Sequence, residues 1–306
     1  MERFRQLFGV EDWNIGVVGQ PAADVVRQGI VAPVRWLPKP SRWEMLADPS
    51  CHVRPDGGLT LFAEWLDHWT GRGEIWAAEI AAGGDPAGAD FRPAVVTPVH
   101  MSYPFPFTDA DGSRWLTAET WEAGAAPLWH EVDGEWRPAS PLFSGRPVVD
   151  PTLWRGTDRW WLFCTFEDDL PNARLHLFHA AVPQGPWQPH PANPVKTDPG
   201  SSRPAGPLFE ADGVLIRPAQ DCSRTYGGGV VLNAVRRLDP EGFVEEACRR
   251  LAPVPGPFPD GLHTFCPAGQ ATLIDGKRWR FPALQLLCKW NVSRLARARQ
   301  RRLRSP

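Results

Sequence analysis

Five short turns recur along this chain of 306 residues, and an apolar, strand-like run follows each of them. Asp-Gly between two apolar runs is a strong hairpin signal, because both central residues of the turn favour positive φ. Spacings of roughly 45 to 63 residues separate the turns, close to the period of propeller blades. The turns are Asp56-Gly57, Asp111-Gly112, Gly156-Thr157, Asp212-Gly213 and Asp275-Gly276.

This repetition predicts an all-β fold, a five-bladed β-propeller closed by an N-terminal strand. Radial repetition of hairpins leaves few exposed sheet edges, which suits a chain of short strands. The run from Trp13 to Val18 is expected to pair with the last blade and close the ring. The 34 prolines and 28 glycines fit many tight turns, and the 16 tryptophans argue against disorder. A β-sandwich with coincidental hairpins is the alternative.

The repeats predict one propeller domain over residues 1–290 and a basic C-terminal tail over 291–306. Within the domain, the charged stretch from Arg236 to Leu251 is a candidate to contain a short helix. The tail is expected to be a solvated, frayed terminus. A basic helix that contacts a membrane or an acidic partner is the alternative.

Several function classes find no support in the sequence. A net charge of −2 argues against general binding to nucleic acid or membrane surfaces. The six cysteines show no CxxC and no Cys/His spacing, so we expect buried thiols, no metal site and no cofactor. No G-x-S-x-G, Walker or G-x-G-x-x-G motif opens a helix. Since no apolar segment follows Met1, the expected location is cytoplasmic.

Polar residues gather where the hairpins of a propeller would meet. The start of each first strand and the end of each second strand lie at the same edge, which in a propeller is one rim of the central channel. First-strand starts supply Asp48, Tyr103, Asp150, Arg203 and His263. Second-strand runs supply Glu64, Glu119, Arg217 and Gln220, and Asp221 follows directly. We expect these ten side chains to share one pocket.

Such a cluster is either a structural ring of salt bridges or an active site, because unpaired ionisable groups are costly to bury. Paired carboxylates suit chemistry on a glycosidic bond, where one acid protonates the leaving oxygen and the other activates an attacking group. Arginines can hold a carboxylate or phosphate with two hydrogen bonds. The predicted ligand is therefore a carbohydrate or a sugar phosphate.

A set of short motifs, spread from about Trp13 to Pro282, resembles a known family. The motifs include Ala47-Asp48-Pro49, Ser102-Tyr103-Pro104, Val149-Asp150-Pro151, Ser202-Arg203-Pro204 and Arg217-Pro218-Ala219-Gln220. Together they resemble the N-terminal domain of glucosamine inositolphosphorylceramide transferases. That domain is similar to the five-bladed propellers of family 43 glycoside hydrolases and invertases.

The resemblance implies roles for three acids. Asp48 matches the catalytic base, Asp150 matches the aspartate that orients the substrate and tunes the acid, and Glu119 is the candidate acid. Glu64, Tyr103, Arg203, Arg217, Gln220, Asp221 and His263 would bind substrate. The family 43 propellers have the acid in a blade after the one that carries the second aspartate, whereas Glu119 precedes Asp150 in this sequence.

Three functions follow from this. The first is an enzyme that hydrolyses or transfers glycosidic bonds in intracellular glycan or glycolipid metabolism. The second is a non-catalytic sugar-binding or scaffold module for a separate glycosyltransferase, since sugar transfer in the plant proteins is credited to a C-terminal domain. The third is a protein-interaction propeller.

Overall fold

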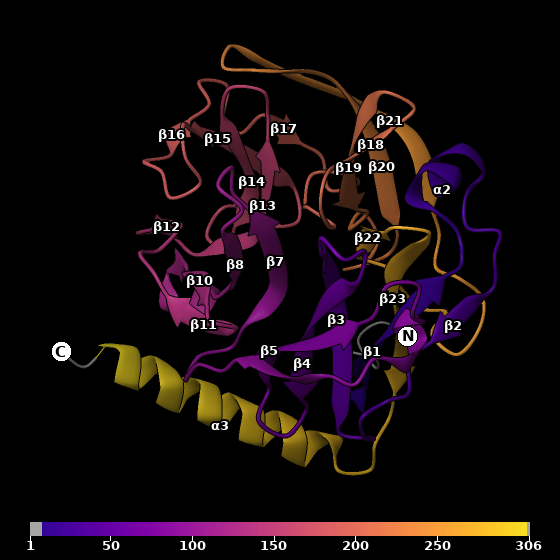
Figure 1. Cartoon of the computed structure of the whole chain (residues 1–306). Helices are drawn as coiled ribbons and strands as arrows, with labels where there is room; N and C mark the ends of the chain where they lie inside the picture. The colour runs from indigo at the N-terminus through magenta and orange to yellow at the C-terminus, as the bar shows by residue number, and fades with distance from the viewer. Residues whose placement is uncertain (1–7, 305–306) are drawn as a thin grey trace.

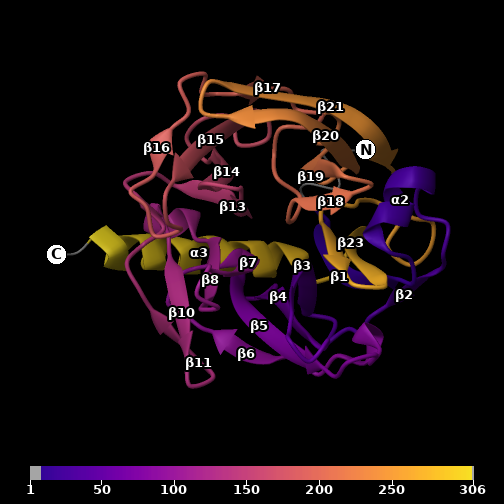
Figure 2. The same ribbon diagram turned by 45° about the horizontal axis from the view of Figure 1, so that its top comes forward.

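The computed structural model describes residues 8–304, which form five antiparallel sheets arranged as blades around one axis (Figures 1 and 2). Blade 1 contains β3 (Glu44–Val53), β4 (Leu59–Asp67), β5 (Arg72–Ile80) and β6 (Arg92–Val95). Blade 2 contains β7 (Ser102–Thr108), β8 (Arg114–Glu119), β10 (Leu128–Val132) and β11 (Glu135–Pro138), and β9 (Ala125–Ala126) pairs with β12 (Phe143–Ser144) beside it. The predicted five-bladed propeller is confirmed.

The remaining blades follow the same plan. Blade 3 contains β13 (Val148–Arg155), β14 (Trp160–Phe166), β15 (Arg174–Ala180), β16 (Gln188–Pro189) and β17 (Lys196–Thr197). Blade 4 contains β18 (Phe209–Ala211), β19 (Val214–Gln220), β20 (Val230–Asp239) and β21 (Gly242–Leu251). Short helices cover the connections: α2 (Ala22–Gln28), η1 (Pro86–Gly88) and η2 (Trp121–Ala123).

Blade 5 joins the two ends of the chain. Its order is β22 (Phe265–Ala268), β23 (Ala271–Arg280), β1 (Val10–Val18) and β2 (Val34–Trp36). The N-terminal strand β1 pairs with β23 along its whole length, from Val10 opposite Arg280 to Val18 opposite Thr272. The closure predicted for this strand is therefore confirmed.

Adjacent blades pack through separate apolar cores, one for each interface. Phe62 of blade 1 packs with Leu116 of blade 2, and Leu61 packs with Leu273 of blade 5. Apolar clusters of the same kind join the other blades. Successive side chains of a strand point to opposite faces of its sheet, so one strand can contribute to the cores on both sides. Because the cores lie between the blades, the inner strand edges remain available to form a site on the axis.

The fifth predicted turn is wrong. Asp275 and Gly276 lie in the middle of β23, and the hairpin turn is at Gly269-Gln270. A local Asp-Gly signal is overridden here because Asp275 is buried and because β1 needs a full-length partner. Gly276 provides a close approach: a Cβ there would lie 2.3 Å from the Trp36 ring.

We expect Gly276→Ala to destabilise the fold by about 1–3 kcal/mol, because the Trp36 ring has no room for the added methyl group. Chemical denaturation measures this loss directly. Gly19→Ala is the matched control, since no atom lies within 4 Å of a Cβ at Gly19. An equal loss in both variants would show that backbone freedom, and not the Trp36 contact, is the cause.

Two further predictions about elements are also wrong. Arg236–Leu251 forms most of the long β20–β21 hairpin and not a helix, because Asp239 accepts hydrogen bonds from the N–H groups of Glu241 and Gly242 and so turns the chain. Residues 291–304 of the expected frayed tail belong to the helix α3 (Gln285–Arg304), which lies along one face of the ring (Figure 1), and residues 305–306 lie outside the described residues. No helix in the described part of the chain is long and apolar enough to cross a membrane.

Candidate active site

A cavity of about 240 Å³ lies where the inner strands of the five blades meet. Six of the ten predicted residues line it. These are Asp48, Glu64, Glu119, Asp150, Arg203 and His263. Trp13, Tyr226, Glu11, Leu66 and His100 complete much of the wall. The pocket therefore combines carboxylates, one guanidinium group, two histidines and two aromatic rings.

The first strands of blades 1, 2 and 3 share one local distortion. Each contains a β-bulge at which a residue with positive φ precedes a proline: Asp48 (φ 51), Tyr103 (φ 47) and Asp150 (φ 49). Non-glycine residues in this region are strained by about 1–2 kcal/mol. The bulge redirects the residue that carries it, so the repeated X-Pro motif is the sequence origin of the site.

Hydrogen bonds from these bulges connect neighbouring blades. The N–H of Asp48 donates to Asp275 Oδ2 at 3.3 Å, and the N–H of Tyr103 donates to Asp48 Oδ2 at 3.1 Å. The N–H of Asp150 donates to Glu119 Oε2 at 3.2 Å. Each bulge thus offers its N–H to a carboxyl group of the preceding blade. Asp48 and Glu119 of the pocket, together with the buried Asp275, therefore link neighbouring blades.

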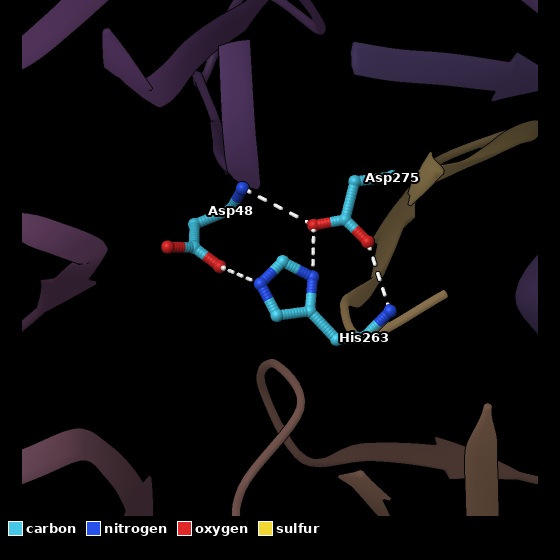
Figure 3. A group of neighbouring side chains, drawn as sticks. All are labelled: Asp48, His263 and Asp275. Atoms are coloured by element: carbon cyan, nitrogen blue, oxygen red, sulfur yellow. Dashed lines mark hydrogen bonds and ion pairs between the residues drawn. The ribbon is translucent and has the colours of Figure 1, made fainter. Parts of the chain in front are cut away.

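Asp48, His263 and Asp275 form a buried triad (Figure 3). His263 Nδ1 lies 2.6 Å from Asp275 Oδ2, and His263 Nε2 lies 3.3 Å from Asp48 Oδ1. Burial disfavours charge on the imidazole, but the two carboxylates raise the pKa of His263 above its ordinary value. The arrangement favours an imidazolium ion between two acids. The Trp13 ring stacks on the imidazole, with 3.9 Å between the two ring centres.

Each aspartate of the triad has a distinct environment. Burial raises the pKa of Asp48 to about 6, against the lowering effect of His263. Burial would also raise the pKa of Asp275, but His263 and hydrogen bonds from the N–H groups of His263 and Thr264 hold it below its ordinary value. Asp275 therefore acts as the permanent counter-ion of His263, and Asp48 is the member that can change its charge near neutral pH.

The same three residues offer ligand atoms within 4.8 Å of one another, the spacing that a metal ion would need. Their donor set does not require one. Asp275 already accepts three main-chain N–H groups, from Asp48, His263 and Thr264. His263 supplies the balancing positive charge. The chemistry of the cluster is therefore that of an ion-pair relay.

Two glutamates of the pocket favour the neutral form. Burial, together with the charges of Asp48 and Glu119, raises the pKa of Glu64 well above its ordinary value. Burial and the charge of Asp150 do the same for Glu119. Glu64 Oε1 is buried without a hydrogen-bond partner, whereas Glu119 Oε2 accepts the N–H of Asp150. Within the described structure, Glu64 therefore combines a raised pKa with an oxygen that has no hydrogen-bond partner.

Arg203 is held by the opposite wall. Its Nε lies 2.7 Å from Asp150 Oδ2, and Gln220 donates to the same oxygen at 3.0 Å. The guanidinium group also lies 5.0 Å from the centre of the Tyr226 ring. Asp150 is therefore occupied by an arginine and an amide, which suits a residue that positions a cation for substrate more than one that attacks it.

The other predicted binding residues do not reach the pocket. Tyr103 is buried in the blade 2–3 core, and its hydroxyl accepts the N–H of Gly206. Arg217 pairs with Glu245 through two hydrogen bonds and donates to the carbonyls of Ser201 and Ser202, just before Arg203. Asp221 lies outside the pocket with Ser223 and Arg250. Charge alone could not tell Arg217 from Arg203.

Sequence reasoning missed three contributors. The sequence pattern predicts a turn at Asp275 and an ordinary strand position at Trp13, and no repeat position marks His100. Burial lowers the pKa of His100 to about 4, and the Gly73 N–H donates to its Nδ1. Its Nε2 lies 3.7 Å from Glu64 Oε1. The length of the last repeat, longer than the others, was the available signal that Asp275 lay outside a turn.

A family model described as "Glucosamine inositolphosphorylceramide transferase 1, N-terminal" matches residues 7–251. The chain belongs to this family. The match includes four of the six predicted pocket residues in blades 1 to 3 and also Arg203, but it ends before His263. Five of the six predicted residues that line the pocket therefore lie within the region that matches the glucosamine inositolphosphorylceramide transferase 1 N-terminal family.

Curated relatives carry the same name. The protein from Oryza sativa subsp. japonica is 32% identical over 213 residues, covering 65% of this chain and 27% of that protein. The protein from Arabidopsis thaliana is 30% identical over 210 residues, covering 65% of this chain and 26% of that protein. The aligned part thus spans about a quarter of each curated relative.

Solved structures share the fold. The catalytic domain of the Coprinopsis cinerea GH62 α-L-arabinofuranosidase aligns with a TM-score of 0.55 at 15% identity, covering 74% of this chain and 79% of that one. A thermostable family 43 glycoside hydrolase aligns with a TM-score of 0.53 at 15% identity, covering 69% and 78%. The propeller of this family is therefore built like those of carbohydrate-active enzymes.

Proposed function

We propose that the chain cleaves or transfers a glycosidic bond in the axial pocket. The observation that carries this proposal is the split between the acids of the pocket: Asp48 has a pKa of about 6 beside His263, whereas Glu64 favours the protonated form. Paired acids whose environments give them different protonation states are typical of glycosidic-bond chemistry.

In the proposed reaction Asp48 takes a proton from water or from an acceptor hydroxyl group. The oxygen so activated forms a bond to the anomeric carbon, and the bond from that carbon to the leaving oxygen breaks. Glu64 gives its proton to the leaving oxygen. We assign this donor role to Glu64 in place of Glu119, because Glu64 Oε1 has no competing hydrogen bond within the described structure.

The remaining pocket groups would bind the substrate. Arg203, fixed by Asp150, presents a cation suited to a phosphate or carboxylate beside the sugar. Trp13 and Tyr226 line the pocket and would contribute apolar contacts to the sugar. The names of the curated relatives support a sugar transferred to or from inositolphosphorylceramide, or a related anionic glycolipid, as the substrate class. An intracellular location stays part of this proposal.

The test is turnover of activated glycosides and nucleotide sugars, glucosamine donors included, by wild type and Asp48→Asn. We expect Asp48→Asn to lower kcat by about 10²–10⁴-fold, the range for removal of a general base. In the wild type, kcat/KM should increase as pH rises through about 6, because Asp48 must be ionised to accept a proton.

Asp111→Asn is the matched control, since Asp111 is an exposed aspartate in a blade turn and should leave turnover unchanged. Calorimetric titration with the same sugars separates catalysis from binding. Tight sugar binding without any turnover, unaffected by Asp48→Asn, would contradict the proposal and favour the sugar-binding module.

A further inference from the structure

The outward surface of α3 carries a concentrated apolar patch. Five of the twelve exposed large apolar side chains that the structure describes lie between Phe281 and Trp290. On the helix itself they are Leu286, Leu287 and Trp290, which are 60%, 59% and 65% exposed. Positions 286 and 290 are one helical turn apart, so these residues share one face. Such a patch usually marks an interaction site.

The opposite face of α3 fixes the helix against the propeller. Gln285 and Cys288 are buried there, and the Asn291 side chain donates to the Trp69 carbonyl at 2.8 Å. Further along, Arg299 contacts Glu122 at 3.2 Å. The helix crosses behind the centre of the ring in Figure 2. Because both halves of α3 are anchored, the orientation of its exposed face is set by the fold.

The exposed face becomes basic beyond Trp290. Arg294, Arg297 and Arg301 are exposed and follow Trp290 at helical spacing, and the Arg294 guanidinium lies 5.4 Å from the Trp290 ring. The sequence of α3 contains seven Lys and Arg residues and no Asp or Glu, although the whole chain has a net charge of −2. Positive charge is therefore concentrated on this one helix.

We propose that the exposed face of α3 docks on an anionic lipid surface. Exposed Trp and Leu beside a row of arginines is the composition of helices that lie in the membrane interface, where the apolar groups enter the acyl boundary and the cations contact lipid phosphates. A second copy of the chain is disfavoured, because α3 contains no Asp or Glu and a symmetric contact between two α3 helices would therefore give the arginines no acidic partner from the helix. This inference stands independently of the proposed function.

Docking through α3 would also place the axial pocket next to the lipid. A second cavity of about 530 Å³ lies between α3 and the propeller. Its walls include Val292 and Cys288 of α3, and it shares Glu11 and Leu66 with the axial pocket. One helix, about 10 Å across, would thus separate the pocket region from the lipid headgroups.

Vesicle co-flotation of the full chain tests the proposal, with phosphatidylcholine vesicles compared with vesicles that also contain phosphatidylserine. We expect flotation only with phosphatidylserine, and less of it as salt increases. Arg294→Gln/Arg297→Gln/Arg301→Gln should weaken partitioning on the order of a hundredfold, since each arginine near an anionic surface contributes about fivefold. Leu286→Ser/Trp290→Ser should weaken it by at least about tenfold.

Matched controls replace exposed residues elsewhere on the propeller. Arg92→Gln/Arg137→Gln/Arg236→Gln and Val182→Ser/Val244→Ser should float like wild type, and circular dichroism verifies that every variant is folded. Absence of flotation with phosphatidylserine overturns the proposal. So does equal flotation of the α3 and control variants, or a wild-type dimer in sedimentation equilibrium that Leu286→Ser/Trp290→Ser dissociates.

Discussion

Asp275→Asn is expected to lower the free energy of unfolding by about 3–5 kcal/mol, the range for removing one partner of a buried ion pair. Asp275 is fully buried, lies 2.6 Å from His263 Nδ1 and accepts three main-chain N–H groups. The amide would remove the nearer of the two carboxylates that balance the charge of His263. In a domain of this size the melting temperature should fall by about 10 °C, measured by calorimetry.

Asp56→Asn provides the control, because Asp56 stands in the same Asp-Gly dipeptide but in a true hairpin turn on the surface. We expect a change below about 1 kcal/mol there. A small loss in Asp275→Asn would show that the triad is not needed for the closure of blades 5 and 1, and the ion-pair interpretation of Figure 3 would be wrong.

The comparison of these two aspartates shows what the sequence can and cannot predict. Asp-Gly is a local signal, and at Asp56 nothing in the tertiary structure competes with it. In the second dipeptide, Asp275 is buried beside His263, and Gly276 packs closely against the Trp36 ring. Both contacts depend on residues from other parts of the chain. Hairpins and their number were therefore predictable, whereas the exact place of the last turn was not.

The pocket divides in the same way. Asp48 and Asp150 were predictable because a residue before proline at the start of a first strand repeats from blade to blade. Glu64 and Glu119 followed from their equal distance to the preceding turn. Partner choice was not predictable, since Arg203 and Arg217 have similar sequence settings but pair with acids on different blades, Asp150 and Glu245.

The acids of the pocket also differ in what they do for the fold. Asp275 is paired with His263 and Asp150 is paired with Arg203, so both carboxylates stabilise the ring. Glu64 is buried near Asp48 and Glu119 with one oxygen unpartnered, an arrangement that hydrophobic packing alone would not produce. A residue that is unfavourable for stability and central to the pocket is best explained by chemistry.

Glu64→Gln is therefore expected to lower turnover and raise stability together. Loss of a general acid costs about 10²–10⁴-fold in kcat. The folded protein raises the pKa of Glu64, so its contribution to stability is complete below about 4.5, the ordinary value, and is lost as pH rises through the folded value. Glutamine has no charge to bury, so the melting temperature at neutral pH should exceed that of wild type.

Paired measurements of kcat and melting temperature across pH distinguish this from a structural role. Above pH 4.5 the melting temperature of wild type should fall relative to that of Glu64→Gln, because only wild type must ionise a buried carboxyl group. Glu119→Gln is the comparison, since that carboxyl group is equally buried but accepts the N–H of Asp150. If Glu119→Gln loses turnover and Glu64→Gln retains it, the proton donor is Glu119. If Glu64→Gln loses stability as well as turnover, the role of Glu64 is structural and the proposed catalytic role is wrong.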